Sequence, residues 1–290
     1  RDRWCDRQHR LAEGEGVAAM RIGTTSYILA DDILPNVRYL APLVDDIELV
    51  LFESEGEDNL PTKAVIRGLN ELAQEHGLTY TVHFPLDVYP GSQDRKVRQR
   101  TLDTYLRVID LTQSLNPFGY ILHLTPDQYG PTASKDIPAW LSCLDESLER
   151  LLESSHIDSQ MFCAETLSYP FGLVKPLVDK HNLAVTLDIG HVWMMGYDAQ
   201  QSCCSLLGNT RVCHLHGVDS SSKDHQSLTE GDPQLIERFL SSLMEQDRDG
   251  KQRVLTLEVF NQHDFLTSLS LLRQSHAMMG KREVGKLWLQ

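Results

Sequence analysis

Histidines and carboxylates recur at the ends of short apolar runs along this chain. In LAVTLDIGHV, residues 183–192, Asp188 follows a run typical of a buried strand and His191 lies three positions later. Burying either group without a partner costs several kcal/mol. A single case is usually a helix cap or a hydrogen-bonded core residue, but here the pattern recurs. Seven of eight such runs end near residues that can bind a metal, namely Glu53, His83, His123, Glu165, Asp188 with His191, His214 with His216, and Glu258.

Imidazoles and carboxylates that converge on one poorly solvated cavity repel each other or lose hydration unless cations hold them together. The repetition therefore predicts a divalent metal centre. Mixed nitrogen and oxygen ligands suit zinc, manganese or ferrous iron better than calcium or magnesium, which prefer oxygen shells.

The elements that would position these residues alternate along the chain. The strand-like runs span 21–27, 46–53, 78–84, 120–124, 161–166, 183–188, 211–216 and 253–259. Segments with helical spacing follow them at 33–42, 61–76, 95–115, 135–155, 171–181, 198–207, 233–246 and 263–274. The runs are almost continuously apolar, which is typical of parallel strands buried on both faces. The alternation predicts an α/β fold, a single (β/α)8 TIM barrel, whose strands all end at one mouth.

A doubly wound open sheet is the alternative fold, but the first run continues into GTTSY and lacks a glycine-rich phosphate turn. The barrel is expected to occupy residues 20–275 as one catalytic domain. Residues 1–19 are charged throughout, without the apolar core of a signal peptide, and are expected to form a disordered leader. Residues 276–290 are expected to form a C-terminal extension.

Composition excludes several classes of function. The chain has 290 residues and no apolar run near the roughly 20 residues that span a bilayer, so no membrane association is expected. Its formal net charge of -14 argues against nucleic acid as a partner. The six cysteines form no CxxC pair, which favours reduced thiols in a cytoplasmic protein.

Seven motifs occur in a characteristic order: TVHFP, ILHLT, FCAET, LDIGHV, CHLHGVD, DHQSLTEG and LTLEV. Over residues 20–274 this order resembles the xylose-isomerase-like TIM-barrel superfamily, which includes endonuclease IV and the sugar-phosphate isomerases and epimerases. Within it, MRIGTTSYILADDILPNV followed by VDDIELVLFE is similar to the cobamide-remodelling phosphodiesterases.

The resemblance implies ligands for two or three divalent metals per chain. They are His83, His123 and Glu165 for a first metal, Glu165, Asp188, His214 and Glu258 for a second, and His191 and His225 for a third. The remaining carboxylate of the third site falls at Lys223, with Asp224 one place away, which leaves that site incomplete. Isomerase members resemble only the second set, so His83 and His123 favour a hydrolytic centre.

The resemblance implies a phosphodiesterase that hydrolyses the nucleotide loop of a cobamide to cobinamide phosphate, with no organic cofactor. Glu165 would bridge the metals around the attacking hydroxide, while Asp188 and Glu258 would complete the second site and restrain the water. One alternative is a sugar or sugar-phosphate isomerase or epimerase, in which Glu165 and Glu258 exchange a proton across the substrate. A second alternative is an endonuclease IV-like activity on abasic DNA, which the net charge disfavours.

Some residues are candidates for contact with a corrinoid substrate. Arg95 and Lys96 lie in YPGSQDRKVRQR, where they either bind a phosphate or only begin a solvated helix. Glu53 would contact substrate or anchor its loop. Aromatic residues just beyond strand ends would line an apolar entrance suited to a large planar ligand: Tyr27, Tyr89, Tyr129, Tyr169 and Trp193. His216 and Asp219 are expected to orient His214.

Overall fold

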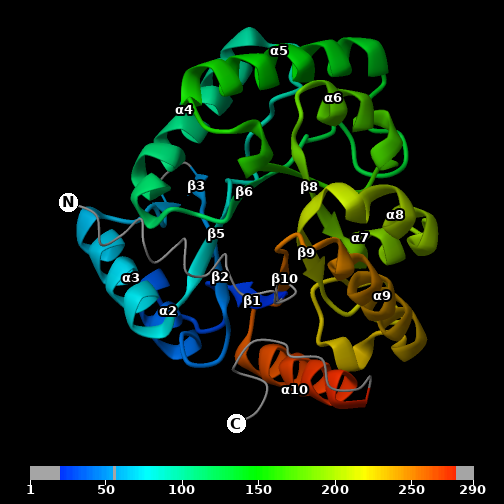
Figure 1. Ribbon diagram of the computed structural model, residues 1–290. Coiled ribbons are helices and arrows are strands. Elements are labelled where there is room, and N and C mark those ends of the chain that lie inside the picture. Colours follow the sequence, from blue (N-terminus) through cyan, green and yellow to red (C-terminus); the bar gives the residue numbers. More distant parts are fainter. Residues whose placement is uncertain (1–19, 55–56, 279–290) are drawn as a thin grey trace.

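Eight parallel strands close into a barrel in the computed structural model, which describes residues 20–54 and 57–278. The strands are β1 Arg21–Thr25, β2 Asp46–Val50, β5 Thr79–His83, β6 Gly119–Leu122, β7 Phe162–Glu165, β8 Ala184–Asp188, β9 Thr210–Leu215 and β10 Val254–Leu257. Their order around the barrel is β1-β10-β9-β8-β7-β6-β5-β2, and each neighbouring pair runs parallel (Figure 1). The prediction of a single (β/α)8 barrel is confirmed.

Helices surround the barrel as an outer ring (Figure 1). They are α2 Ile33–Leu40, α3 Lys63–His76, α4 Arg95–Thr112, α5 Ile137–Ser155, α6 Lys175–Lys180, α7 Ile189–Met194, α8 Ala199–Leu206, α9 Pro233–Gln246 and α10 Gln262–Met278. Short 3-10 turns span Gln113–Leu115, Ser159–Met161, Phe171–Leu173, Leu207–Asn209, Leu228–Glu230 and Asp247–Asp249. Helix α7 directly continues β8 and was not predicted as a separate element.

Local sequence explains where the helices begin and which face they bury. Thr62 caps α3 by accepting a hydrogen bond from the Val65 amide, and Gly77 ends that helix at φ 73°, a conformation that glycine adopts without strain. Along α5, residues at three- and four-residue steps form one buried stripe: Trp140, Leu144, Leu148 and Leu151. Such stripes hold the helices against the outer surface of the barrel.

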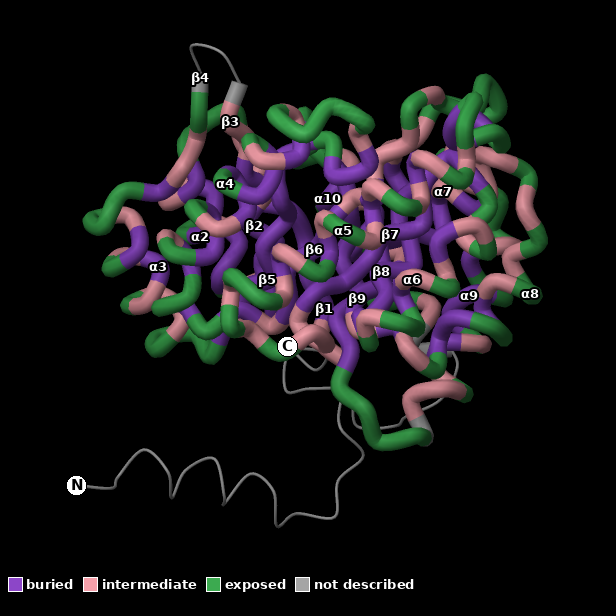
Figure 2. The backbone as a smooth tube through the Cα atoms, turned by 90° about the horizontal axis from the view of Figure 1, so that it is seen from above, coloured by how far each residue is buried: buried purple, intermediate pink, exposed green. Residues whose placement is uncertain are grey.

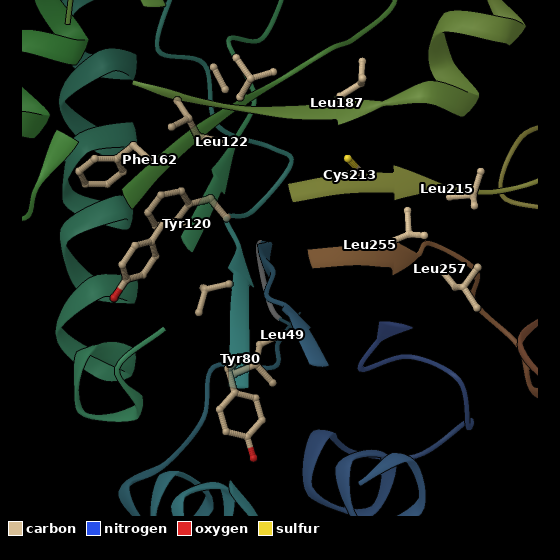
Figure 3. Packing of buried hydrophobic residues seen from close by; sticks show 14 of the residues in the cluster. Leu49, Tyr80, Tyr120, Leu122, Phe162, Leu187, Cys213, Leu215, Leu255 and Leu257 are labelled. Atoms are coloured by element: carbon tan, nitrogen blue, oxygen red, sulfur yellow. The ribbon is translucent and has the colours of Figure 1, made fainter. Parts of the chain in front are cut away.

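Side chains of each strand point alternately into the barrel and outward to the helices. Figure 3 shows outward residues of several strands, among them Leu49, Tyr80, Phe162, Leu187 and Cys213. The Tyr80 hydroxyl, for example, donates to the Leu69 carbonyl of α3 at 2.7 Å. Figure 2 shows the strands as the buried centre of the molecule.

An inner apolar layer closes the barrel below the polar residues. It consists of Ile121, Cys163, Ala184 and Val212, which pack together and are at most 1% exposed. Two residues further along the chain, and again pointing inward, lie His123, Glu165, Thr186 and His214, respectively. The interior is therefore a packed core with a polar upper layer, as in other barrels of this type.

The second strand is shorter than predicted. β2 ends at Val50, and the chain then forms an antiparallel hairpin of β3, Glu53–Ser54, and β4, Glu57–Asp58, which stands out from the barrel in Figure 2. The prediction that Glu53 ends a barrel strand is therefore wrong, because the hairpin carries it away from the wall.

The last helix of the barrel ends later than predicted. Helix α10 continues to Met278, four residues past its predicted end at residue 274. The predicted leader at 1–19 lies outside the described residues, as does 279–290 of the predicted extension. Within the part of the chain that is described, no helix has both the length and the apolar character needed to cross a bilayer.

Candidate metal centre

The predicted ligands on the strands point into the barrel at the same end. Side chains alternate between inward and outward along each strand, and all the parallel strands end at one mouth. His83, Glu165 and Asp188 are the last residues of β5, β7 and β8, while His123 and Glu258 directly follow β6 and β10. His214 is in β9. The structure brings them together at the carboxyl end of the barrel, the end at which barrel enzymes carry their chemistry.

A first cluster consists of His83, His123 and Glu165, whose ligand atoms lie within 4.8 Å of one another. Oε2 of Glu165 is 2.9 Å from Nε2 of His123 and 3.3 Å from Nε2 of His83. Nδ1 of His83 is 2.7 Å from the Phe84 carbonyl, to which it donates. A neutral His83 therefore directs the lone pair of Nε2 toward Glu165.

A second cluster of Glu165, Asp188, His214 and Glu258 adjoins the first, again with ligand atoms within 4.8 Å. Nδ1 of His214 lies 3.6 Å from Glu165 Oε1, 3.9 Å from Asp188 Oδ2 and 3.1 Å from Glu258 Oε2. Among the described residues, three of these buried atoms have no hydrogen-bond partner: His214 Nδ1, Asp188 Oδ2 and Glu258 Oε2. Buried polar atoms that face one another unpaired fit a cation between them.

A third cluster contains a histidine that was not predicted as a ligand. His191, His216 and His225 have ring nitrogens within 4.8 Å of one another. Lys223, at the position of the expected carboxylate, is not in this cluster. Asp224 lies nearby, with Oδ2 3.8 Å from Nε2 of His225. The spacing of His214 and His216 in CHLHGVD could have indicated that His216 also faces the centre, since residues two apart along an extended segment point the same way.

The predicted roles of His216 and Asp219 are wrong in detail. His216 lies against Asp188, with Nε2 3.2 Å from Oδ1, rather than against His214. Asp219 instead accepts hydrogen bonds from the backbone amides of Ser221 and Lys223 and so stabilises its own turn.

Gly190 makes room for His216. A Cβ placed on Gly190 would lie 2.2 Å from the imidazole of His216, closer than real Cβ contacts come. The imidazole therefore packs directly on the backbone at the start of α7. The glycine in LDIGHV is thus a packing requirement of the site.

The charges of the clusters depend on one another. Burial alone would lower the pKa of His83, but Glu165 raises it to about 9. Burial likewise opposes protonation of His216, but Asp188 raises the pKa of this residue to about 9. Burial would raise the pKa of Glu165, yet His123 and His214 hold it well below its ordinary value of 4.5. Without metal, protonated imidazoles therefore balance the carboxylates.

The predicted substrate residues lie farther out. Arg95 and Lys96 are exposed on the first turn of α4. Glu53 forms an ion pair with Arg107 of α4. The ring centre of Trp193 is 6.3 Å from that of Phe239 in α9, and Trp193 lines a groove of about 820 Å³ between α7, α8 and α9.

A smaller cavity of about 490 Å³ lies beside the mouth. Its lining includes Glu53 of β3, Asp87 and Tyr89 of the loop that follows β5, and Arg100 and Arg107 of α4. Within the basic stretch, Arg100 lines this cavity, whereas Arg95 and Lys96 do not.

The aromatic residues predicted to line the entrance differ in their exposure to solvent. Tyr169 is buried, and its hydroxyl donates to the Leu124 carbonyl at 2.7 Å, so it belongs to the core. Tyr89 and Tyr129 are 47% and 74% exposed in loops that follow β5 and β6. Leu86 and Phe260, 57% and 43% exposed, lie in the loops after β5 and β10. Most of the large exposed apolar side chains in the described ranges thus lie at the carboxyl end of the barrel.

A closed parallel barrel with histidine and carboxylate clusters at its mouth defines a TIM barrel able to carry metal chemistry. The chain belongs to the xylose isomerase-like TIM barrel family, whose model matches residues 44–281. An uncharacterized protein of Methanocaldococcus jannaschii is 26% identical over 274 residues, covering 89% of this chain and 90% of the relative.

Two solved structures illustrate the shared fold. A D-tagatose 3-epimerase-like protein has a TM-score of 0.73 at 20% identity, covering 89% of this chain and 98% of its own. Endonuclease IV from Thermus thermophilus has a TM-score of 0.67 at 15% identity, covering 89% and 99%. The fold therefore occurs both in a sugar epimerase-like protein and in a nuclease, and the chemistry has to be argued from the site.

Proposed function

We propose that this chain is a metal-dependent phosphodiesterase that hydrolyses the nucleotide loop of a cobamide and leaves cobinamide phosphate. The observation that carries the proposal is the position of Glu165 between two clusters. One carboxylate oxygen faces His83 and His123 at 3.3 and 2.9 Å, and the other faces His191 and His214, each at 3.6 Å. A carboxylate shared in this way suits two adjoining cations, the arrangement used for phosphoester hydrolysis.

The donor sets fit divalent cations. A first cation would be held by His83, His123 and Glu165, and a second by Glu165, Asp188, His214 and Glu258. The unpaired buried atoms of the second cluster face one another, as ligands of a shared ion would. Imidazole and carboxylate ligands suit zinc, manganese or ferrous iron. Bound cations of this kind would polarise a phosphodiester oxygen and lower the pKa of a water toward neutrality.

Residues of the chain fix the carboxylates in place. Asp188 Oδ1 accepts a hydrogen bond from the His191 amide at 2.8 Å, which leaves Oδ2 directed into the cluster. Glu165 and Glu258 would hold the attacking water. In the reaction, water adds to phosphorus, the bond from phosphorus to the ribose oxygen breaks, and that oxygen takes up a proton.

The apolar rim supports a large substrate. Exposed side chains of Leu86, Tyr89, Tyr129 and Phe260 follow strand ends around the mouth. Phe260 lies edge-on beside the third cluster, with its ring centre 5.2 Å from that of His225. Free sugar phosphates present few apolar surfaces for such a rim, whereas the macrocycle of a corrinoid presents a wide one.

A sugar or sugar-phosphate epimerase is the second candidate. The second cluster alone could hold one cation, with Glu165 and Glu258 exchanging a proton across the substrate. This alternative leaves His83 and His123 without a role, although both contact Glu165. An endonuclease on abasic DNA is a third candidate, but the net charge of -14 opposes binding to a polyanion.

One experiment separates the three candidates. Purified protein loaded with zinc, manganese or ferrous iron is incubated with adenosylcobalamin, a ketose phosphate or an abasic duplex, with and without chelator. Chelator-sensitive release of cobinamide phosphate supports the proposal. Epimerised sugar or nicked DNA without corrinoid cleavage would instead establish one of the alternatives.

Replacing Glu165 tests the mechanism. Glu165→Gln should lose at least about a thousandfold in kcat/KM, because removing about 4 kcal/mol of transition-state stabilisation has that effect. The same variant should bind less metal. Glu149→Gln, on the exposed face of α5, serves as the matched control and should behave as the unmodified protein. Full activity in Glu165→Gln would rule out the bridging role.

A further inference from the structure

A fully buried glutamate lies among the predicted ligands. Glu48 is in the middle of β2 and is 0% exposed. Its Oε2 lies 2.9 Å from Nε2 of His214 on β9, and its Oε1 has no hydrogen-bond partner in the described part of the chain. Taking a carboxylate out of water costs several kcal/mol, so its retention needs a compensating interaction.

The contact determines how His214 presents its ring. A neutral imidazole has one N–H and one lone pair. When Nε2 donates to Glu48, Nδ1 carries the lone pair, and Nδ1 is the atom that faces Glu165, Asp188 and Glu258 at 3.1 to 3.9 Å. The opposite tautomer would place a proton where the cation of the second cluster would lie.

We propose that Glu48 is a positioning residue of the metal centre, which fixes the tautomer and ring orientation of His214 so that Nδ1 can bind a divalent cation. Histidines that bind metals commonly donate their other N–H to a carboxylate in this way. The inference rests on the metal centre of the proposed function but requires no particular substrate.

A different role for Glu48 is geometrically possible and has to be distinguished. Ligand atoms of Glu48, His83 and Glu258 also lie within 4.8 Å of one another. If Glu48 bound a cation directly through Oε1, its removal would lower the number of metals bound. If Glu48 positions His214, its removal would lower the affinity and leave the number unchanged at saturation.

Three variants separate these roles. Glu48→Gln keeps an oxygen that can accept from Nε2 of His214, whereas Glu48→Leu removes the acceptor. Asp46→Asn is the matched control, because Asp46 is two residues earlier on the same inward face of β2, is also 0% exposed, and contacts Thr79 and Thr81 instead. Circular dichroism establishes that each variant is folded.

The measurements are zinc affinity by chelator competition, metal content at saturation, and the absorption spectrum of the cobalt-loaded protein, all without substrate. Glu48→Leu should lose roughly 10- to 100-fold in affinity with unchanged metal content and a shifted cobalt spectrum. Glu48→Gln should lose less, and Asp46→Asn should match the unmodified protein within about threefold.

Two results would overturn the inference: Glu48→Leu within threefold of the unmodified affinity, or metal content that falls by one ion. Should Glu48→Leu fail to fold, nitrogen-15 NMR of the histidines in the unmodified, zinc-loaded protein decides the matter. It should show a protonated Nε2 and a metal-bound Nδ1 for His214, and the opposite assignment refutes the proposal. Since no measurement uses substrate, a wrong assignment of the reaction would leave these results unchanged.

Discussion

Loading the centre with metal should release protons, because the imidazoles that would bind the cation carry protons in its absence. Glu165 raises the pKa of His83 to about 9 despite a burial that opposes protonation. Burial also opposes protonation of His214, but Glu258, Glu48 and Glu165 raise its pKa well above the ordinary 6.5. Each ring has to lose a proton before it can bind a metal.

The size of the effect follows from the pKa of His83, which is about 9. At pH 7.5, a group with a pKa of about 9 is roughly 97% protonated, and removing its proton costs about 2 kcal/mol at 1.36 kcal/mol for each pH unit below the pKa. His83 should therefore release about one proton on binding a cation, and His214, whose pKa is also raised, should add to that release. The affinity of a site that displaces one proton should rise about tenfold per pH unit up to pH 9.

The same protons affect folding stability. A histidine whose pKa rises from 6.5 to about 9 on folding stabilises the folded protein fully below pH 6.5 and loses that contribution as the pH rises through 9. The free energy of unfolding of the metal-free protein should therefore fall between pH 6.5 and 9. Stabilisation by added metal should grow over the same range, as measured by thermal unfolding.

Calorimetry tests the proton count. Zinc is titrated at pH 7.5 into the protein in two buffers with different ionisation enthalpies, and the difference in apparent heat gives the protons released. His83→Gln should release about one proton fewer. His76→Gln, an exposed histidine at the end of α3, should release as many as the unmodified protein. Equal heats in both buffers, with an affinity independent of pH, would refute the reasoning.

Two further substitutions probe the neighbourhood of the centre. Gly190→Ala should weaken metal affinity about tenfold or more, because the added Cβ would lie 2.2 Å from the ring of His216. Gly172→Ala is the control and should leave metal affinity unchanged, because nothing lies within 4 Å of its added Cβ. Phe260→Ala should raise KM for a corrinoid several-fold with little change in kcat. The apolar contact stabilises the bound substrate and the transition state to the same extent, so its loss weakens binding alone. Leu266→Ala, also 43% exposed but on α10, is its control in steady-state kinetics.

The barrel and the convergence of most candidate ligands could be predicted because both depend on local patterns. Strands buried on both faces appear as short apolar runs, and a polar residue at the end of such a run is conspicuous. His83, Glu165 and Asp188 each end a strand that the sequence marks clearly. Their convergence then follows from the topology, since all parallel strands of a barrel end at the same mouth.

Glu48 and Glu53 show where local patterns fail. The run DIELVLFE contains both, and its apolar character continues past Val50, where β2 ends. Which glutamate faces the centre depends on the register of β2 against β1 and β5 and on the hairpin that follows. Register is set by closure of the whole barrel, so the run itself does not reveal it. A glutamate in the middle of an apolar run was nevertheless a signal, because such a residue needs a partner.

Charge balance connects the number of metals to the number of protons. Glu48, Glu165, Asp188 and Glu258 are buried and carry four negative charges when ionised. Two divalent cations neutralise four charges with every imidazole neutral, whereas one cation leaves two charges that protons on histidines such as His83 would have to offset. A phosphodiesterase with two cations and an epimerase with one therefore differ in protonation as well as in metal content. Retention of the His83 proton in the fully loaded protein would favour the epimerase over the hydrolase.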